Sequence, residues 1–206
     1  MTTEYPSTGM RRVKRRPRNG ARDALIQWFQ RVPGRLILAH ERARFDSILP
    51  DLFGYHLVQV GEVGDEDLTR SSRVLNRQVA NLRDQSGSTV RSFTTAAEAL
   101  PIQSDSIDVV VLPHVLEFEE NPHEALREVQ RILVPEGHLV ISSFNPWSWF
   151  GVRRLLTRKR QLPWSGHFIS LNRMKDWLAL LGFDVTSNRT FFFTPPIASE
   201  KVINRL

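Results

Sequence analysis

The stretch "SIDVVVL" at residues 106–112 constrains the fold more than any other part of this sequence. It carries an almost uninterrupted apolar run that is too short for a typical helix and lies between turn-forming residues. Such a run predicts a strand that is buried on both faces of a parallel sheet. Further strands are predicted at residues 56–60 ("HLVQV"), 73–79 and 89–93, and after the turn "VPEG" within residues 134–144.

Helical periodicity separates most of these strands. Two helices are predicted before the first strand: they follow Asp23, break at Pro33 and Gly34, and end near Pro50. Because strands alternate with helices along the chain, the sequence predicts an α/β fold. The expected architecture is a Rossmann-like, doubly wound, mainly parallel sheet in three αβα layers.

Two later helices carry clear terminal signals. Asn121 is the predicted N-cap of the first, with Pro122 at the first helical position and Glu124 placed to complete a capping box. The second is expected to begin at a Ser170 cap and to stop at Gly182. Its predicted inward-facing residues are Leu171, Met174, Trp177, Leu178 and Leu181.

The net charge of +6 is unevenly distributed. Residues 11–22 hold seven Lys or Arg and no acid, and residues 153–160 hold five more. Local positive charge of this kind suits contact with a polyanion. Residues 1–20 are polar and lack apolar periodicity, so they predict a disordered tail, whereas residues 21–206 predict a single domain.

Composition excludes several kinds of site. The chain has no cysteine, which excludes disulfides, thiolate nucleophiles and zinc sites built on sulfur. The six histidines show no metal-ligand spacing, so no metal is expected. No run approaches the roughly 18 apolar residues that a membrane-spanning helix needs. No transmembrane segment is therefore predicted, and a cytoplasmic location is expected.

Residues 98–145 carry an ordered series of motifs. They are the turn Leu100-Pro101, the strand start "SIDVV" at 106–110, "HVLE" at 114–117 and the helix-to-strand segment "LREVQRILVPEG" at 126–137. This series resembles the class I S-adenosylmethionine-dependent methyltransferases, specifically the type 11 group. The resemblance covers roughly residues 35–193. The segment "FNPWSWFGVRRL" at 144–155 is similar to a narrower bacterial subgroup.

The resemblance implies transfer of a methyl group from S-adenosylmethionine to an acceptor that the motifs do not identify. In a doubly wound sheet the cofactor lies beyond the carboxyl ends of the strands. The residues expected to bind it are Gly61, Glu62, Val63, Gly64, Ala99, Leu100, Leu112 and Pro113.

The loop after the first strand departs from the family pattern acid-x-Gly-x-Gly-x-Gly. Gln59 stands at the position of the acid and Gly61 keeps the first glycine. Val63 and Asp65 replace the other two glycines. A valine at a place of close backbone approach is expected to put two methyl groups where the methionine moiety lies.

Two further cofactor contacts are altered. At the end of the second strand, where the family usually has an acid for the ribose hydroxyls, the polar residues are Asn76, Gln78 and Asn81. Ala96 is aligned with the Asp that meets the adenine amine in the family. The alternatives for the altered contacts are Glu62, Asp65 and Glu98, which lie nearby in the sequence.

His114 is the candidate general base. It follows the strand of residues 106–112, on the edge where the methyl group would lie. The alternative is a histidine that only packs or caps. Glu117 is expected to be structural, at the start of a helical turn.

Residues 145–164 interleave aromatic and basic side chains where this family builds substrate-recognition elements. The candidate substrate contacts are Asn145, Trp147, Trp149, Arg153 and Arg154. Aromatic rings for stacking and cations for phosphate suit the binding of RNA or a nucleotide, and an anionic small molecule is a further alternative. A basic helix on a membrane surface, or a lid helix with solvated arginines, has the same pattern.

An alternative function follows from the two basic segments. It is a catalytically silent methyltransferase-like protein that binds nucleic acid or another polyanion through residues 11–22 and 153–160.

The family closes its sheet with an antiparallel hairpin. Here "FDVTSNRTFFFTPP" at 183–196 offers one strand, and the final antiparallel strand is expected to be missing. That would leave either a truncated chain or an edge that a partner covers or that is otherwise blunted.

Overall fold

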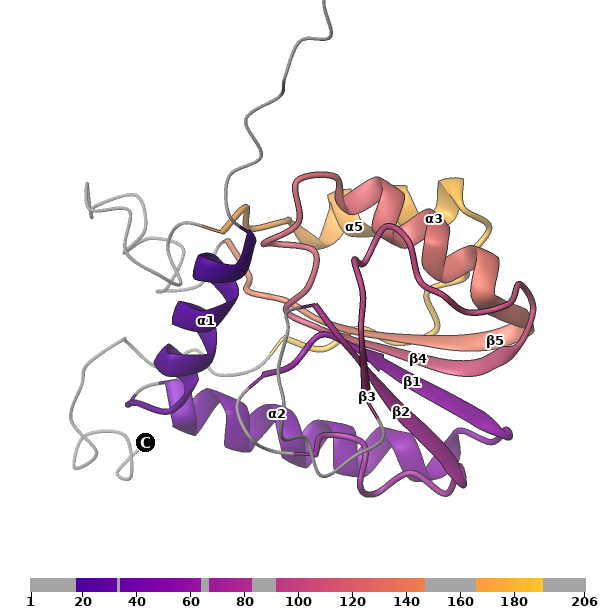
Figure 1. Ribbon diagram of the computed structural model, residues 1–206, viewed down its shortest axis with the longest axis horizontal. Helices are drawn as coiled ribbons and strands as arrows, with labels where there is room; N and C mark the ends of the chain where they lie inside the picture. Colours follow the sequence, from indigo (N-terminus) through magenta and orange to yellow (C-terminus); the bar gives the residue numbers. More distant parts are fainter. Residues whose placement is uncertain (1–17, 33, 64–66, 83–91, 147–165, 191–206) are drawn as a thin grey trace, which may run out of the picture.

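The computed structural model describes residues 18–32, 34–63, 67–82, 92–146 and 166–190. Its helices are α1 (Arg18–Phe29), α2 (Gly34–Ile48), α3 (Pro122–Ile132) and α5 (Leu171–Leu180), with a short 3-10 helix at Leu49–Asp51 (Figure 1). Its strands are β1 (His56–Val60), β2 (Asn76–Asn81), β3 (Ser92–Thr94), β4 (Ile107–Pro113) and β5 (Leu133–Ser142).

The five strands form one parallel sheet in the order β3-β2-β1-β4-β5. β1 lies at the centre, with Gln59 opposite Val79 of β2 and Val111 of β4. The strand order reverses between β1 and β4. Ligands of doubly wound sheets bind beyond the carboxyl ends of the strands at such a point. The predicted Rossmann-like fold is thus confirmed.

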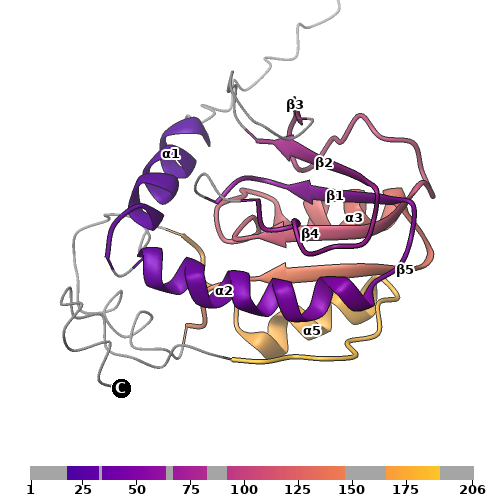
Figure 2. The ribbon, with the colours of Figure 1, turned by 90° about the horizontal axis from the view of Figure 1, so that it is seen from below.

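Alternate residues of β4 serve two separate apolar layers, as expected for a strand buried on both faces. Val109 and Val111 pack with α1 and α2, whereas Val110 and Leu112 pack with α3 and α5. Figures 1 and 2 show α2 on one face of the sheet and α3 on the other. The three-layer αβα arrangement follows from this alternation.

Helix α3 begins with Pro122 at its first position, as predicted, but the capping box does not form. The Asn121 side chain makes no capping hydrogen bond. The backbone carbonyl of Asn121 accepts from the N–H of Glu124 (3.0 Å) and of Ala125 (3.3 Å) instead. The backbone alone satisfies these first-turn donors, and the predicted apolar face of α3 is buried.

Helix α5 is terminated as predicted. Ser170 Oγ accepts a hydrogen bond from the N–H of Arg173 (3.4 Å), and Gly182 ends the helix with a φ of +79°. Met174 and Leu178 are buried. Leu171 is 45% exposed, so its predicted inward position is wrong. Periodicity assigns a residue to a face but does not say where the covered part of that face ends.

Several boundaries differ from prediction. β2 begins three residues later than expected, because Asn76 donates to the carbonyl of Tyr55 just before β1 and so aligns with the start of that strand. The predicted start of β3, at residues 89–91, lies outside the described residues. α1 begins at Arg18, so residues 18–20 belong to a helix rather than to the predicted tail.

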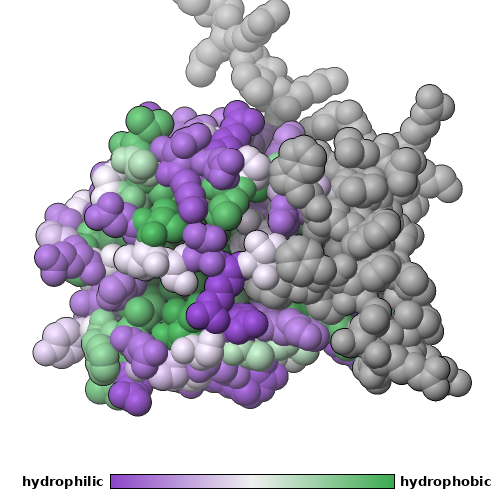
Figure 3. All heavy atoms as spheres, turned by 180° about the vertical axis from the view of Figure 1, so that it is seen from behind, coloured by the Kyte–Doolittle hydropathy of each residue, from purple (hydrophilic) through white to green (hydrophobic). Residues whose placement is uncertain are grey.

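The strand β5 is half-buried along most of its length, although a buried strand was predicted. It is the last strand of the described sheet and pairs only with β4. Figure 3 shows apolar patches on the face that lies at the back of Figure 1. Residues 183–190 form no strand, and residues 191–206 lie outside the described part. No helix of the described ranges is long and apolar enough to cross a membrane.

Candidate functional site

The residue after β1, Gly61, has a φ of +85°, which favours glycine. A Cβ built on it would lie 2.9 Å from Nη1 of Arg22 and 3.0 Å from Cγ2 of Val115. Its N–H donates to the carbonyl of Ala80 in β2 (2.8 Å). Both the backbone conformation and the close approach of two other segments therefore require a glycine here.

Two buried amide side chains lie beside Gly61. Gln59 donates from Nε2 to the Gly61 carbonyl (2.9 Å), and its Oε1 has no hydrogen-bond partner among the described residues. Asn81 ends β2 at the same edge, and its Oδ1 likewise has none in this part of the chain. Asn76 begins β2 at the opposite edge. The carboxyl edge of the sheet thus holds two buried amide oxygens at positions where the family resemblance predicts acidic side chains.

The side chain of Val63 points into the apolar core and not toward the expected cofactor position at this edge. Its side chain is 1% exposed and belongs to the apolar cluster of Leu25 and Phe29 in α1. We expected its methyl groups to lie where the methionine moiety binds. They pack in the core instead, because α1 extends the apolar layer as far as this loop.

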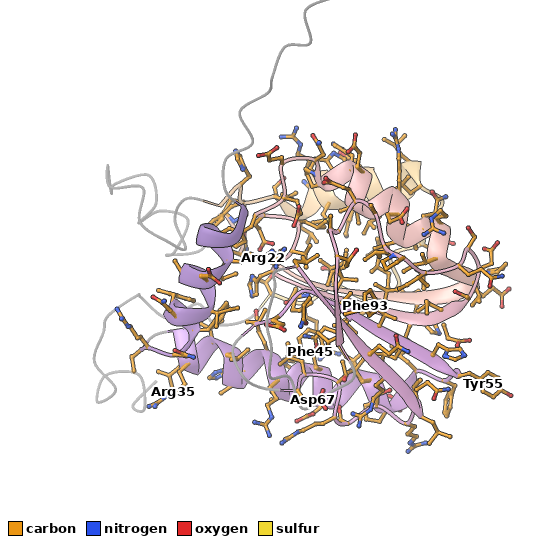
Figure 4. All side chains as sticks on the ribbon, in the orientation of Figure 1. Arg22, Arg35, Phe45, Tyr55, Asp67 and Phe93 are labelled. Atoms are coloured by element: carbon orange, nitrogen blue, oxygen red, sulfur yellow. The ribbon has the colours of Figure 1, made fainter. Side chains whose placement is uncertain are left out.

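Arg22 of α1 reaches the same edge. Figure 4 shows it at the carboxyl ends of the strands, whereas Tyr55 marks the amino end. Its Nη2 donates to Oε1 of Glu119 at 3.0 Å, and both side chains are buried. Burial lowers the pKa of the Arg22 guanidinium, and the charges of Glu119, Glu117 and Glu62 oppose this effect. The sequence analysis counted this arginine with the basic segment 11–22, but it is buried at this edge of the sheet and paired with Glu119.

His114 lies between two carboxylates in the interior. Its Nε2 is 2.7 Å from Oε1 of Glu41 in α2, and its Nδ1 is 3.1 Å from Oε1 of Glu117. The same Glu117 oxygen accepts the N–H of Phe144 after β5 (2.8 Å). The imidazole also packs against the ring of Phe144, with centroids 4.2 Å apart. We call Arg22, Glu41, His114, Glu117 and Glu119 the edge network.

The charge of His114 follows from these contacts. Burial disfavours the imidazolium, but the attraction of Glu41 and the hydrogen bonds to Glu117 and Glu41 outweigh it and raise the pKa of His114 to about 10. A protonated imidazole has no free lone pair. The predicted role as a general base therefore requires that the proton first move to Glu41 or Glu117, and that role stays a prediction.

The turn after β3 is held by α3. Glu128 accepts the N–H of Leu100 (2.8 Å), and Arg131 donates to the carbonyls of Leu100 (3.2 Å) and Ile102 (2.8 Å). The two side chains also pair with each other at 2.8 Å. The hydrogen bond from Arg131 lowers the pKa of Glu128 against the opposing effect of partial burial. The family's helix motif thus positions one wall of the candidate cofactor site.

The other predicted site residues are only partly brought together. Leu112 and Pro113 are buried at the end of β4. After β3, Leu100 is buried and Ala99 is exposed. Glu62 and Asn145 are half-buried. Gly64, Trp147, Trp149, Arg153 and Arg154 lie outside the described residues. Within the described residues, no group of three or more His, Asp or Glu side chains is placed to hold a metal ion.

Sequence reasoning missed Arg22, Glu41 and Glu119. Arg22 precedes Leu25 by three residues, and Glu41 precedes Phe45 by four, so both share a helix face with buried apolar residues. That spacing was the available signal. Their charges made both look like solvated positions.

The fold and the site define a class of protein. The sheet is parallel and has the strand order β3-β2-β1-β4-β5, a glycine with positive φ follows β1, and buried polar groups lie at the adjoining strand ends. This is the arrangement of class I S-adenosylmethionine-dependent methyltransferases. The family model described as a methyltransferase domain, type 11 group, matches residues 67–141. Over these residues the chain is similar to this family.

Two curated proteins are similar in sequence. The uncharacterized protein YafS of Escherichia coli (strain K12) is 32% identical over 149 residues, which are 70% of this chain and 59% of YafS. The ubiquinone biosynthesis O-methyltransferase of Roseobacter denitrificans is 31% identical over 132 residues, which are 59% of this chain and 52% of that enzyme. The matches thus span between about half and three fifths of the relatives' length.

A solved structure shares the fold. The S-adenosylmethionine-dependent methyltransferase TM1293 of Thermotoga maritima matches with a TM-score of 0.60 and 21% identity, covering 77% of this chain and 75% of that one. These comparisons show the shared fold and a sequence similarity to methyltransferases. They do not favour the alternative of a silent polyanion-binding protein.

Proposed function

We propose that this chain binds S-adenosylmethionine at the carboxyl edge beside Gly61 and transfers its methyl group to an acceptor. The observation that carries the proposal is a set of buried polar atoms without partners among the described residues: Oε1 of Gln59, Oδ1 of Asn81 and Nη1 of Arg22. Each such atom costs about 1–3 kcal/mol when left unsatisfied. A ligand that supplies the matching groups stabilises this edge.

The cofactor carries groups that complement the two amides. Its ammonium group is a donor for Oε1 of Gln59, and its ribose hydroxyls are donors for Oδ1 of Asn81. An amide oxygen accepts a hydrogen bond as a carboxylate does, but without the charge that strengthens it. The bound cofactor supplies an electrophilic methyl group on a sulfonium, and the chain's own residues bind and orient it.

The charge of the edge network supports a cationic cofactor. Three buried carboxylates, those of Glu41, Glu117 and Glu119, face two cations, His114 and Arg22. The surplus of negative charge in a site shielded from water favours a sulfonium over a neutral thioether.

The methyl acceptor, either a small molecule or RNA, binds to residues 145–164 in this proposal. Asn145 follows β5 at the same edge of the sheet. His114 stays the predicted base, but both of its ring nitrogens face carboxylates, so a proton taken from the acceptor reaches the imidazole only through Glu41 or Glu117. Rate profiles against pH for any identified acceptor test this step.

The cofactor contact is tested by restoring the family's acid. Asn81→Asp is expected to tighten binding of S-adenosylhomocysteine about 10-fold, because a charged acceptor strengthens a hydrogen bond by roughly 1–2 kcal/mol. Isothermal titration calorimetry measures the affinity. Asn76→Asp makes the same chemical change at the exposed, opposite end of β2 and is the matched control.

The wild-type chain itself is expected to gain thermal stability with S-adenosylmethionine or S-adenosylhomocysteine. If millimolar ligand gives neither a thermal shift nor a calorimetric signal, the proposal is wrong. Equal effects of the two Asn→Asp changes would show that the ribose does not lie beside Asn81.

A further inference from the structure

The amino edge of the sheet, opposite the candidate cofactor site, exposes large apolar side chains. Phe53 is 67% exposed, Tyr55 77% and Leu75 91%, and Ile48 at the end of α2 is 39% exposed. We call these four residues the amino-edge patch. Single exposed apolar residues are ordinary on a protein surface, whereas a group of them marks an interaction site. We propose that the amino-edge patch docks this protein on an anionic lipid surface.

The backbone brings members of the patch together. Tyr55 directly precedes β1 and Leu75 directly precedes β2, and the N–H of Asn76 donates to the carbonyl of Tyr55 (3.3 Å). Since His56 is the partner of Asn76 in the parallel register, Tyr55 and Leu75 lie side by side at the strand starts. Figure 4 shows Tyr55 at this end of the molecule, and Figure 1 shows the turns before β1 and β2 next to each other there.

The turn before β1 is held in place by a neighbouring strand. Oδ2 of Asp108 in β4 accepts the N–H groups of Tyr55 and His56, both at 2.9 Å. Gly54 approaches the same side chain so closely that a Cβ on it would clash with Asp108. A turn that is fixed before binding loses little conformational entropy when it meets a partner.

The charges beside the patch favour an anionic partner. The guanidinium of Arg73 lies over the ring of Phe53, 5.9 Å from its centroid, and both side chains are exposed. Arg44 is exposed one helical turn before Ile48, and Asp51 is the exposed acid between Ile48 and Phe53. An arginine beside an exposed ring allows the ring to enter a headgroup layer while the cation stays with the phosphates.

Charge also decides between a lipid surface and a second copy of this chain. The protein carries a net charge of +6 at pH 7, so two copies repel each other, whereas an anionic bilayer attracts a cationic protein. Two acids close to the patch do not reverse this, because Asp46 is paired with Arg70 (3.2 Å) and Asp108 binds backbone N–H groups. The patch lies on turns, and a headgroup layer takes up single side chains, while a stable protein interface needs about 800 Å² per partner.

Docking at the amino edge leaves the candidate cofactor site free. Gly61 follows β1, Asn81 ends β2 and His114 follows β4, so all three lie at the opposite ends of the strands. The lipid contact is therefore independent of cofactor binding.

The absence of cysteine in the chain allows a direct test, because an introduced cysteine takes a single label. Leu75→Cys is labelled with the environment-sensitive fluorophore NBD. With vesicles of phosphatidylcholine and phosphatidylglycerol at about 2:1, its emission is expected to shift to the blue as the label enters the headgroup layer. Leu180→Cys, at a position that is 84% exposed on α5, is the matched control and is expected to show no shift.

Cosedimentation with the same vesicles measures the contribution of the apolar side chains. Phe53→Ser/Leu75→Ser is expected to weaken binding on the order of 10-fold or more, because two large side chains lose their burial in lipid. Leu171→Ser/Leu180→Ser removes two exposed apolar side chains from α5 and is expected to bind as the wild type does. The basic segments 11–22 and 153–160 are unchanged in both variants, so the difference between them reports on the patch.

The outcomes are clear-cut. An equal response of the two labels, or equal vesicle binding by the two double variants, overturns the proposal. A blue shift of the label at position 75 that appears without vesicles, as the protein concentration rises, would identify a second copy as the occupant and also overturns it. Neither outcome bears on the proposed function, since titration with S-adenosylhomocysteine is carried out without vesicles.

Discussion

Single residues of the edge network hold separate parts of the chain together through charge. His114 follows β4 with a φ of +48°, which is uncommon for a residue that has a side chain. Its imidazole joins Glu41 of α2 to Glu117 of the turn after β4. Removing one partner of a buried ion pair leaves an uncompensated charge and costs roughly 3–5 kcal/mol. The ion pairs of the edge network thus contribute to the stability of the fold at the candidate site.

His114 should give the protein a stability that falls at alkaline pH. Its folded-state pKa of about 10 lies above the ordinary value of 6.5. Its stabilising contribution is therefore complete below about pH 6.5, declines as the pH rises and is lost above about pH 10. We compare the wild type with the double variant Glu41→Gln/Glu117→Gln by urea unfolding. Between pH 7 and pH 9 the free energy of unfolding of the wild type is expected to drop by roughly 2–3 kcal/mol more than that of the double variant.

Nitrogen NMR of the imidazole gives an independent check. Both ring nitrogens of His114 are expected to be protonated at pH 8 in the wild type but not in the double variant. A neutral His114 ring at pH 8 in the wild type would contradict the ion pairs described here.

At the scale of elements, α3 covers one face of the sheet and also fixes the turn after β3. Its apolar face packs on the sheet, while Glu128 and Arg131 bind backbone groups of Leu100 and Ile102. Thr95 adds a hydrogen bond from Oγ1 to the carbonyl of Ala99 (2.7 Å). Side chains of α3 and the hydroxyl of Thr95 thus hold the backbone of this turn.

Arg131→Ala is expected to loosen this turn. The variant loses hydrogen bonds to two backbone carbonyls and the pairing with Glu128, a loss of about 1–2 kcal/mol because Arg131 is partly exposed. Urea unfolding measures the stability, and amide exchange at Leu100 is expected to accelerate. Arg127→Ala, on the exposed side of the same helix, is the control. Equal exchange rates in both variants would show that Arg131 does not hold the turn.

At the scale of the whole molecule, α1 and α2 are part of one layer rather than an appendage. Phe29 packs beside His114 and Phe144, with ring centroids 5.2 and 6.2 Å away. The apolar contacts of α1 and the salt bridge of Arg22 reach the same strand ends. Loss of packing in α1 should therefore disturb the site as well as the fold.

Phe29→Ala tests this coupling. The cavity is expected to cost about 3–5 kcal/mol of unfolding free energy, measured in urea. Affinity for S-adenosylhomocysteine is expected to fall as well, because Arg22 is carried by the same helix. Gln27→Ala changes an exposed residue of α1 and should alter neither quantity. A destabilised variant with unchanged affinity would show that the site does not depend on the packing of α1.

Local patterns predicted the sheet and its covering helices well, since burial on both faces of β4 and the apolar stripe of α3 are encoded by neighbouring residues. They could not predict the edge network. Glu41 and His114 are 73 residues apart, and no periodic signal links them. The side-chain direction of Val63 was also wrong, because it depends on where α1 packs.

The long separations within the edge network have a consequence for synthesis of the chain. Arg22 and Glu41 are translated early, but their partners follow 97 and 73 residues later. Until those segments have left the ribosome, the first two helices must keep these charges in water. These two ion pairs are therefore expected to form late in folding, since contacts of such large sequence separation are slow to form. A nascent chain that stalls before β4 would expose the apolar faces of both helices to chaperones or to aggregation.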